Sequence, residues 1–136
     1  VLPGVTAMLA AAARAGAPLG HDFCVINLSD NLKPQSLIEQ RVRAAAGADM
    51  AMAFYNPRSA SRPHTFERVL QLLREACEPE RLLIFARAVS TPHEQLRCVP
   101  LSQAQADMAD MRTLVIVGSS TTRRVGRYVY TPRSAS

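Results

Sequence analysis

Three polar loops of this sequence carry residues that could bind an anionic ligand. They lie at 56–63, 87–92 and 118–124, and each follows an apolar run typical of a buried strand. Their hydroxyls, backbone groups and arginines suit carboxylates or phosphates, and no nucleophilic triad is evident. Because ligands bind beyond the carboxyl ends of strands in α/β sheets, we expect these loops to form one site that aligns a reactant.

The histidines give weaker chemical signals. His21 is next to Asp22, and such a carboxylate can fix an imidazole tautomer. Neighbours on a strand point to opposite faces, so we favour a structural turn there over a catalytic pair. His64 and His93 lie in polar segments and are predicted at the surface. The segment 118–122 could form an anion nest, but it lacks the spacing of a phosphate-binding P-loop.

A helix start at residues 3–7 is a further candidate for ligand contact. Pro3 fixes its φ angle, Gly4 lets the backbone approach a ligand, and Thr6 can cap a helix or donate its hydroxyl. An alanine-rich helix follows and is expected to end at Gly16. From composition alone, an ordinary capped helix packed on a sheet remains the favoured interpretation.

Strand-like runs alternate with helical periodicities along the rest of the chain. Strands are expected at 23–28, 50–55, 82–88, 95–100 and 113–118, with an edge strand at 127–132. Helices are expected at 37–47 and 66–75, with a short polar helix at 103–108. The runs 82–88 and 95–100 are predicted to pair as an antiparallel hairpin. The sequence therefore predicts an α/β fold: a mixed sheet of about five strands flanked by helices on both faces.

Composition limits the class of protein. The chain has 136 residues, 48% of them hydrophobic and 20% charged, which is typical of one soluble domain. Three widely spaced cysteines predict neither a disulfide framework nor a zinc site, so we expect reduced thiols, no metal and a cytoplasmic location. No apolar run reaches the roughly 20 residues that cross a bilayer, so no membrane partner is expected.

The positive charge leaves two kinds of partner open. The net charge is +5, and Lys33 is the only lysine, so the excess is arginine. Arginine suits both polyanionic small molecules and nucleic acids. Only 5% of the residues are aromatic and tryptophan is absent, which gives little support for base stacking, so we expect no nucleic-acid partner.

Ordered motifs give this chain a resemblance to the tetrapyrrole (corrin and porphyrin) methylases. Residues 2–7, followed by Gly-Ala-Pro-Leu-Gly-His-Asp at 16–22, resemble the start of that family's second domain. The segments at 28–30, 53–59, 107–123 and 130–133 narrow the resemblance to one branch. It implies methylation at C-17 of precorrin-3B with ring contraction in cobalamin biosynthesis, and it covers nearly the whole chain.

The resemblance also implies an architecture and a cofactor. Members have two α/β domains, hold S-adenosyl-L-methionine in the cleft between them and typically form homodimers. Residues 1–136 would then be the C-terminal half, without the N-terminal domain and its glycine-rich loop, and would be inactive alone. Cofactor contacts are implied at Thr6, Ala7, Asn56 and Ala88. The carboxylates of the tetrapyrrole substrate would bind Arg58, Arg62, Arg123 and Arg124.

Two alternatives stay open at this point. One is another tetrapyrrole methylase, acting at a different ring position. The other is a basic α/β module that binds RNA or another polyanion, for which the arginine excess is the motive. No residue is identified as the catalytic base.

Overall fold

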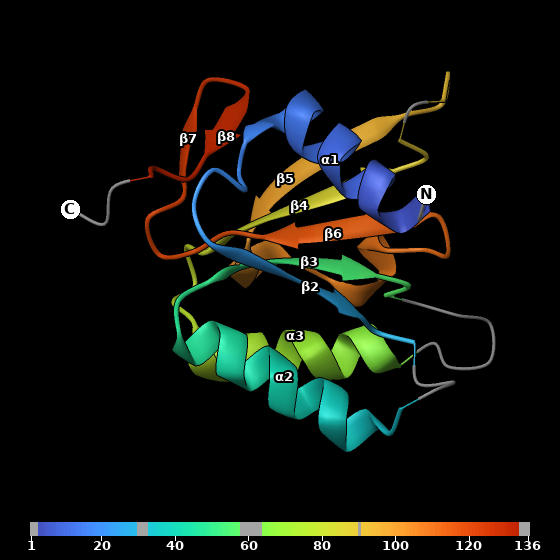
Figure 1. Cartoon of the computed structure of the whole chain (residues 1–136), viewed down its shortest axis with the longest axis vertical. Coiled ribbons are helices and arrows are strands. Elements are labelled where there is room, and N and C mark those ends of the chain that lie inside the picture. Colours follow the sequence, from blue (N-terminus) through green and yellow to red (C-terminus); the bar gives the residue numbers. More distant parts are fainter. Residues whose placement is uncertain (1–2, 30–32, 58–63, 90, 134–136) are drawn as a thin grey trace.

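A mixed five-stranded sheet with helices on both faces forms the centre of the computed structural model (Figure 1). The structure describes residues 3–29, 33–57, 64–89 and 91–133. The order in the sheet is β2-β3-β6-β4-β5. Its strands are β2 (Phe23–Asn27), β3 (Ala51–Tyr55), β4 (Leu82–Arg87), β5 (Gln95–Pro100) and β6 (Thr113–Val117). The predicted α/β fold with a mixed sheet is confirmed, and so is the antiparallel pairing of β4 with β5.

The strand directions define two ends of the sheet. β2 is parallel to β3, and β6 is antiparallel to both β3 and β4. β2, β3 and β4 therefore all stop at one end, which we call the carboxyl end, and start at the opposite amino end. Because β6 runs the other way, the loop 118–124 that follows it lies at the amino end. The prediction that 118–124 joins 56–63 and 87–92 in one site is wrong.

One face of the sheet is covered by the alanine-rich helix α1 (Pro3–Ala15). Ala11 and Ala15 are buried and belong to one apolar cluster with Ala53 of β3 and Ala86 of β4. Short side chains on both partners allow a close approach between helix and sheet. Helix and strands are thus held in a fixed relation, which matters because α1 begins near the strand ends described below.

The opposite face carries α2 (Gln35–Gly47) and α3 (Thr65–Ala76), which pack beside each other (Figure 1). Phe66 of α3 and Phe85 of β4 meet edge to face, with ring centroids 6.0 Å apart. The short polar helix expected at 103–108 is instead two 3₁₀ turns, η1 (Leu101–Gln103) and η2 (Ala106–Met108). The segment bends between them because Ala104 and Gln105 are extended.

A small second sheet pairs the segment that follows α1 with the last strands of the described chain. Its order is β1 (Gly16–Ala17), β8 (Tyr128–Tyr130) and β7 (Arg123–Val125), so the expected last edge strand is the central strand of this sheet. Gly16 has φ 131° and starts β1 opposite Val129. A Cβ at Gly16 would lie 2.5 Å from the Val129 carbonyl oxygen, so this close pairing requires glycine.

Candidate functional site

Two asparagines join the ends of β2 and β3 at the carboxyl end. Asn56 directly follows β3 and adopts φ 53°, a left-handed conformation that asparagine tolerates better than most residues. Its Nδ2 donates to Asn27 Oδ1 at 3.0 Å, and the same oxygen accepts the Ser29 N–H at 2.9 Å. Both asparagines are exposed. The left-handed backbone and the hydrogen bond to Asn27 of the neighbouring strand therefore fix the predicted site residue Asn56, and its side chain is exposed to solvent.

Ala88 occupies the equivalent place after β4. It has φ 51°, which costs an alanine about 1 kcal/mol, and it is buried. Its N–H donates to the Arg112 carbonyl at 3.2 Å, and its own carbonyl accepts the Thr91 hydroxyl at 2.7 Å. The surrounding contacts thus maintain an unfavourable conformation. Such conformations cluster at binding sites, and here they follow two parallel strands at the same end of the sheet.

An ion pair beside Ala88 fixes the turn that leads into β6. Arg87 Nε donates to Asp110 Oδ2 at 2.5 Å, and Asp110 Oδ1 accepts from Arg112 N at 2.9 Å and Thr113 Oγ1 at 2.8 Å. Partial burial raises the pKa of Asp110, but hydrogen bonds from Arg87, Arg112 and Thr113 outweigh it and hold the pKa below its ordinary value. Sequence analysis missed this cluster, although an aspartate two to three residues before a strand is a recognisable turn signal.

The first half of α1 reaches the same end. Tyr55, the last residue of β3, lies next to the backbone of Met8. Burial raises the pKa of the Tyr55 phenol, and the Met8 backbone opposes that shift. Thr6 and Ala7 belong to the same helix and so lie at the carboxyl end with Asn56 and Ala88. The side chains of Thr6 and Ala7, and all of Arg58 and Arg62, fall outside the described residues.

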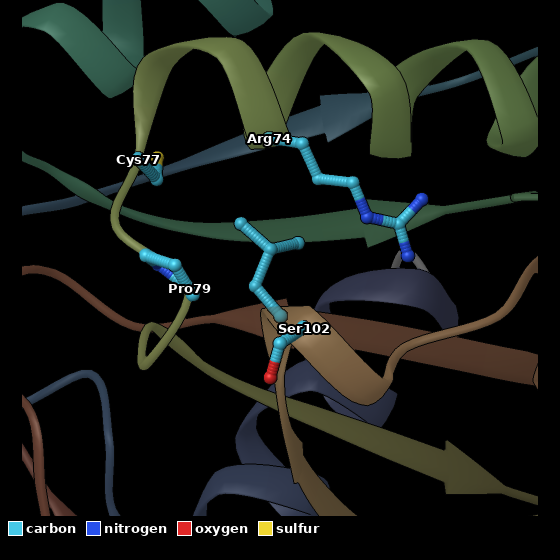
Figure 2. Close-up of a pocket in the computed structure, with 5 residues that line it drawn as sticks. Arg74, Cys77, Pro79 and Ser102 are labelled. Atoms are coloured by element: carbon cyan, nitrogen blue, oxygen red, sulfur yellow. The ribbon is translucent and has the colours of Figure 1, made fainter.

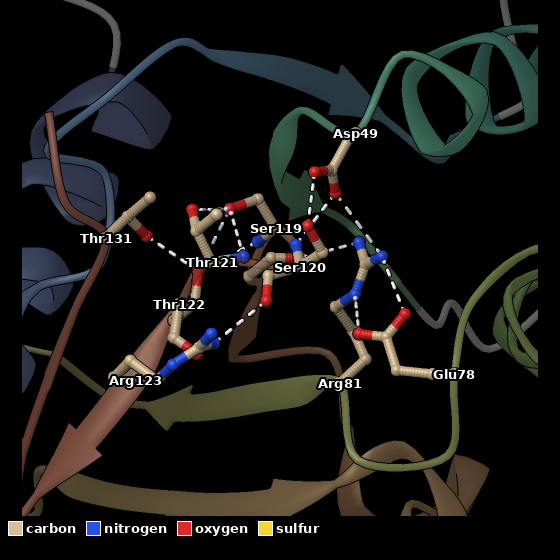
Figure 3. Close-up of polar contacts among 10 residues, drawn as sticks. Asp49, Glu78, Arg81, Ser119, Ser120, Thr121, Thr122, Arg123 and Thr131 are labelled. Carbon is tan, nitrogen blue, oxygen red and sulfur yellow. Dashed lines mark hydrogen bonds and ion pairs between the residues drawn. The ribbon is translucent and has the colours of Figure 1, made fainter. Parts of the chain in front are cut away.

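At the amino end, the loop after β6 uses its hydroxyls internally (Figure 3). Thr122 Oγ1 accepts the Ser119 N–H at 2.8 Å and is 2.7 Å from Thr131 Oγ1, which donates to the Pro18 carbonyl at 2.5 Å. A Cβ at Gly118 would lie 2.6 Å from Thr122 Oγ1, so the turn needs glycine. The groups that would line an anion nest are therefore bonded to one another.

A buried arginine ties this loop to the starts of β3 and β4 (Figure 3). Arg81 binds Glu78 through Nε at 2.7 Å and Nη2 at 3.0 Å, and donates to the Gly118 carbonyl at 3.1 Å. Asp49 lies 3.4 Å from Arg81 and accepts the Ser120 N–H at 2.7 Å. The hydrogen bonds from Arg81 lower the pKa of Glu78. Sequence analysis missed this network, since Glu-Pro-Glu-Arg there looks like an ordinary helix stop.

The remaining predicted arginines are at this amino end. Arg123 Nη1 donates to the carbonyls of Ser120 at 2.9 Å and Thr122 at 3.0 Å, and Arg124 Nε donates to the Gly126 carbonyl at 3.2 Å. Both arginines are exposed. The antiparallel direction of β6 separates them from Asn56 and Ala88, so the structure does not bring Arg123 and Arg124 together with these predicted cofactor residues. Their role in substrate binding stays a prediction.

The other candidates lie at the surface. His21, Asp22, His64 and His93 are exposed. Among the described residues no group of three or more His, Cys, Asp or Glu side chains is placed to bind a metal ion. None of the helices in the described ranges has the length and apolar character needed to cross a membrane.

A shallow cavity of about 260 Å³ lies away from the carboxyl end, between the end of α3 and η1 (Figure 2). It is lined by Arg74, Cys77, Pro79, Leu101 and Ser102. The guanidinium of Arg74 is held there by a hydrogen bond to the Ala104 carbonyl. Burial raises the pKa of the Cys77 thiol, with Arg81 opposing the shift, so this thiol is not activated.

Comparison with known proteins places this geometry in a family. The family model described as Tetrapyrrole (Corrin/Porphyrin) Methylases matches residues 1–105. The chain belongs to the tetrapyrrole methylase family. A precorrin-3B C(17)-methyltransferase of Sinorhizobium sp is 51% identical to this member of the family, over 98% of this chain and 54% of that protein.

Two further proteins are similar to this chain. A probable cobalt-factor III C(17)-methyltransferase of Salmonella typhimurium is 39% identical over 98% of this chain and 55% of that protein. A crystal structure of the methyltransferase CobJ has a TM-score of 0.90 and 67% identity, covering 92% of this chain and 52% of the other. The chain therefore spans about half the length of the relatives that it matches.

Proposed function

We propose that this chain forms half of an S-adenosylmethionine-dependent methyltransferase that methylates C-17 of precorrin-3B, with ring contraction, in cobalamin biosynthesis. The observation that carries the proposal is the 51% identity to a precorrin-3B C(17)-methyltransferase across 98% of this chain. Since only 54% of that relative is matched, the proposal includes an N-terminal domain that supplies the other wall of the site.

The carboxyl end fits half of a cofactor site. S-adenosylmethionine supplies a methyl group on a positively charged sulfur. Ala88 leaves space because its side chain is a single methyl group, and Asn56 offers an exposed amide. Thr6 and Ala7, near the start of α1, would contribute from the helix that covers one face of the sheet. These residues would bind and align the cofactor rather than exchange protons with it. That role suits methyl transfer, whose rate depends on how the cofactor and the substrate approach each other.

The tetrapyrrole's carboxylates need cations near this cofactor end. Arg58 and Arg62 follow Asn56 closely in the sequence, and Asn56 is at the carboxyl end. Arg123 and Arg124 are at the amino end and already bind backbone carbonyls. We therefore favour Arg58 and Arg62 as the residues that bind the substrate carboxylates. Arg123 and Arg124 would bind only a part of the substrate that extends around the domain to the amino end. The proposal also includes a homodimer and a cytoplasmic location.

The test uses the full-length protein that carries this chain. It is incubated with S-adenosylmethionine and, separately, with precorrin-3B and with cobalt-factor III, because the Salmonella relative is named for the second substrate. We expect a product that gains one methyl group, placed at C-17 by NMR, from one of the two substrates. Methylation at another ring position would contradict the proposal and favour a different tetrapyrrole methylase.

A further inference from the structure

The orientation of the Asn27 side-chain amide is decided by a backbone group. The Ser29 N–H can only donate, and it lies 2.9 Å from the Asn27 side chain. The atom of Asn27 that faces it must therefore be the acceptor Oδ1. The short sequence separation makes this an Asx turn, which forms as soon as the end of β2 is in place.

This orientation then decides the orientation of Asn56. Asn56 lies 3.0 Å from the same Asn27 oxygen, so it must present its donor, Nδ2, to Asn27. The other atom of the Asn56 amide, Oδ1, is then turned away from Asn27 and can accept a hydrogen bond from a ligand. Among the described residues, no hydrogen bond to Asn56 Oδ1 is found, and the side chain is exposed. The bond to Asn27 therefore fixes which way the Asn56 amide is turned: Oδ1 is available to accept, and Nδ2 keeps one further N–H.

We infer that Asn27 is a positioning residue that fixes the orientation of the Asn56 amide at the carboxyl end, and that the ligand group bound by Asn56 Oδ1 is an N–H or O–H donor. The inference rests on the proposed function for the nature of that ligand. S-adenosylmethionine carries such donors in its ammonium, adenine amine and ribose hydroxyls. Asn27 touches no reactant in this account and acts only through Asn56.

The experiment is a double-mutant cycle on the full-length protein, with the dissociation constant for S-adenosylmethionine measured by calorimetry. Asn27→Leu removes the acceptor at similar size, and Asn56→Gly removes the amide while keeping the left-handed backbone. Asn27→Asp retains an oxygen that can accept from both donors. Gln103→Leu changes an exposed amide in η1, at the amino end, and is the control. Thermal unfolding establishes that each variant folds.

We expect Asn27→Leu to weaken binding roughly threefold to tenfold, the effect of one hydrogen bond, and to have no further effect in the Asn56→Gly background. Asn27→Asp and the control are expected to stay near the unaltered protein. A second variant, Asn27→Ala, removes the acceptor without adding apolar bulk and should match Asn27→Leu.

Two results would overturn the inference. If the unaltered protein binds S-adenosylmethionine but Asn27→Leu binds equally well, or loses as much affinity with Asn56→Gly as without it, Asn27 does not act through Asn56. If the unaltered protein does not bind S-adenosylmethionine, the proposed function fails as well. Binding of S-adenosylmethionine by the unaltered protein thus distinguishes failure of this inference from failure of the proposed function.

Discussion

At the amino end of the sheet, a buried arginine bonds to carboxylates and a backbone carbonyl, and a row of hydroxyls bonds within the chain. At the carboxyl end, two exposed asparagine side chains and two residues with left-handed backbone lie at the ends of the strands. Arg81, Asp49 and Glu78 form the first arrangement with the loop after β6 (Figure 3). Asn56 and Ala88 belong to the second. Both ends contain the polar residue types expected of a ligand site.

The difference shows that residue type alone does not identify a site. Hydroxyls at 119–122 are suited to bind an anion, yet their hydrogen bonds go to one another and to the chain itself. Asn56 is exposed, and the nitrogen of its side-chain amide bonds to Asn27, which leaves the amide oxygen available to a ligand. Polar groups already satisfied within the protein stabilise the fold, and groups held in place but left unsatisfied are available to a ligand.

The largest expected effect is at the amino end. Arg81→Met removes a buried cation and leaves the Gly118 carbonyl and two carboxylates without their donor. Because Glu78 and Asp49 are partly exposed, we expect a loss of about 2–3 kcal/mol in the free energy of unfolding, less than for a fully buried pair. Urea denaturation of the full-length protein measures this loss.

A matched arginine on the surface provides the control. Arg97→Met changes an exposed residue of β5 and should alter the free energy of unfolding by no more than about 0.5 kcal/mol. Cofactor affinity of the folded Arg81→Met protein should stay unchanged. Equal stability for the two variants would show that the amino end does not depend on its arginine.

A substitution at the carboxyl end should weaken cofactor binding and leave stability unchanged, the opposite of Arg81→Met. Thr6→Val replaces a hydroxyl with a methyl group at nearly constant size, at the start of α1. We expect cofactor binding to weaken roughly threefold to tenfold, the effect of one hydrogen bond, while the unfolding midpoint stays the same. Calorimetry with S-adenosylmethionine is the measurement, and unchanged affinity would remove Thr6 from the site.

The smallest expected effect concerns acid stability at the amino end. The pKa of Glu78 is lowered in the folded protein, so its contribution is present above the unfolded pKa and disappears as the pH falls through the folded value. Glu78→Gln should therefore reduce stability at neutral pH and flatten its decline below about pH 4.3, the ordinary pKa of a glutamate. Urea midpoints recorded from neutral to acid pH measure this, and parallel curves for both proteins would contradict it.

The sequence predicted the elements of this fold better than their directions. Apolar runs such as that of β6 and the helical periodicity of α3 identified strands and helices, because burial imposes those patterns. A fully buried strand has the same pattern whichever way it runs, so nothing local showed that β6 is antiparallel. The misplacement of the loop 118–124 follows from that.

The candidate site was predicted by resemblance more than by local physics. Family motifs indicated Asn56 and Ala88, and the structure adds that both are left-handed at the ends of parallel strands. The contribution of Asn27 could not be predicted, because it depends on a hydrogen bond between residues 29 positions apart. The Arg81 network likewise joins three segments that are distant in the sequence.

Hydrogen exchange of the full-length protein, with and without S-adenosylmethionine, compares the two ends most directly. The account predicts slower amide exchange on cofactor binding in peptides that cover 54–57 and 86–89, at the carboxyl end, and no change in a peptide that covers 119–124. Protection of 119–124 by the cofactor, with 54–57 and 86–89 unaffected, would contradict it.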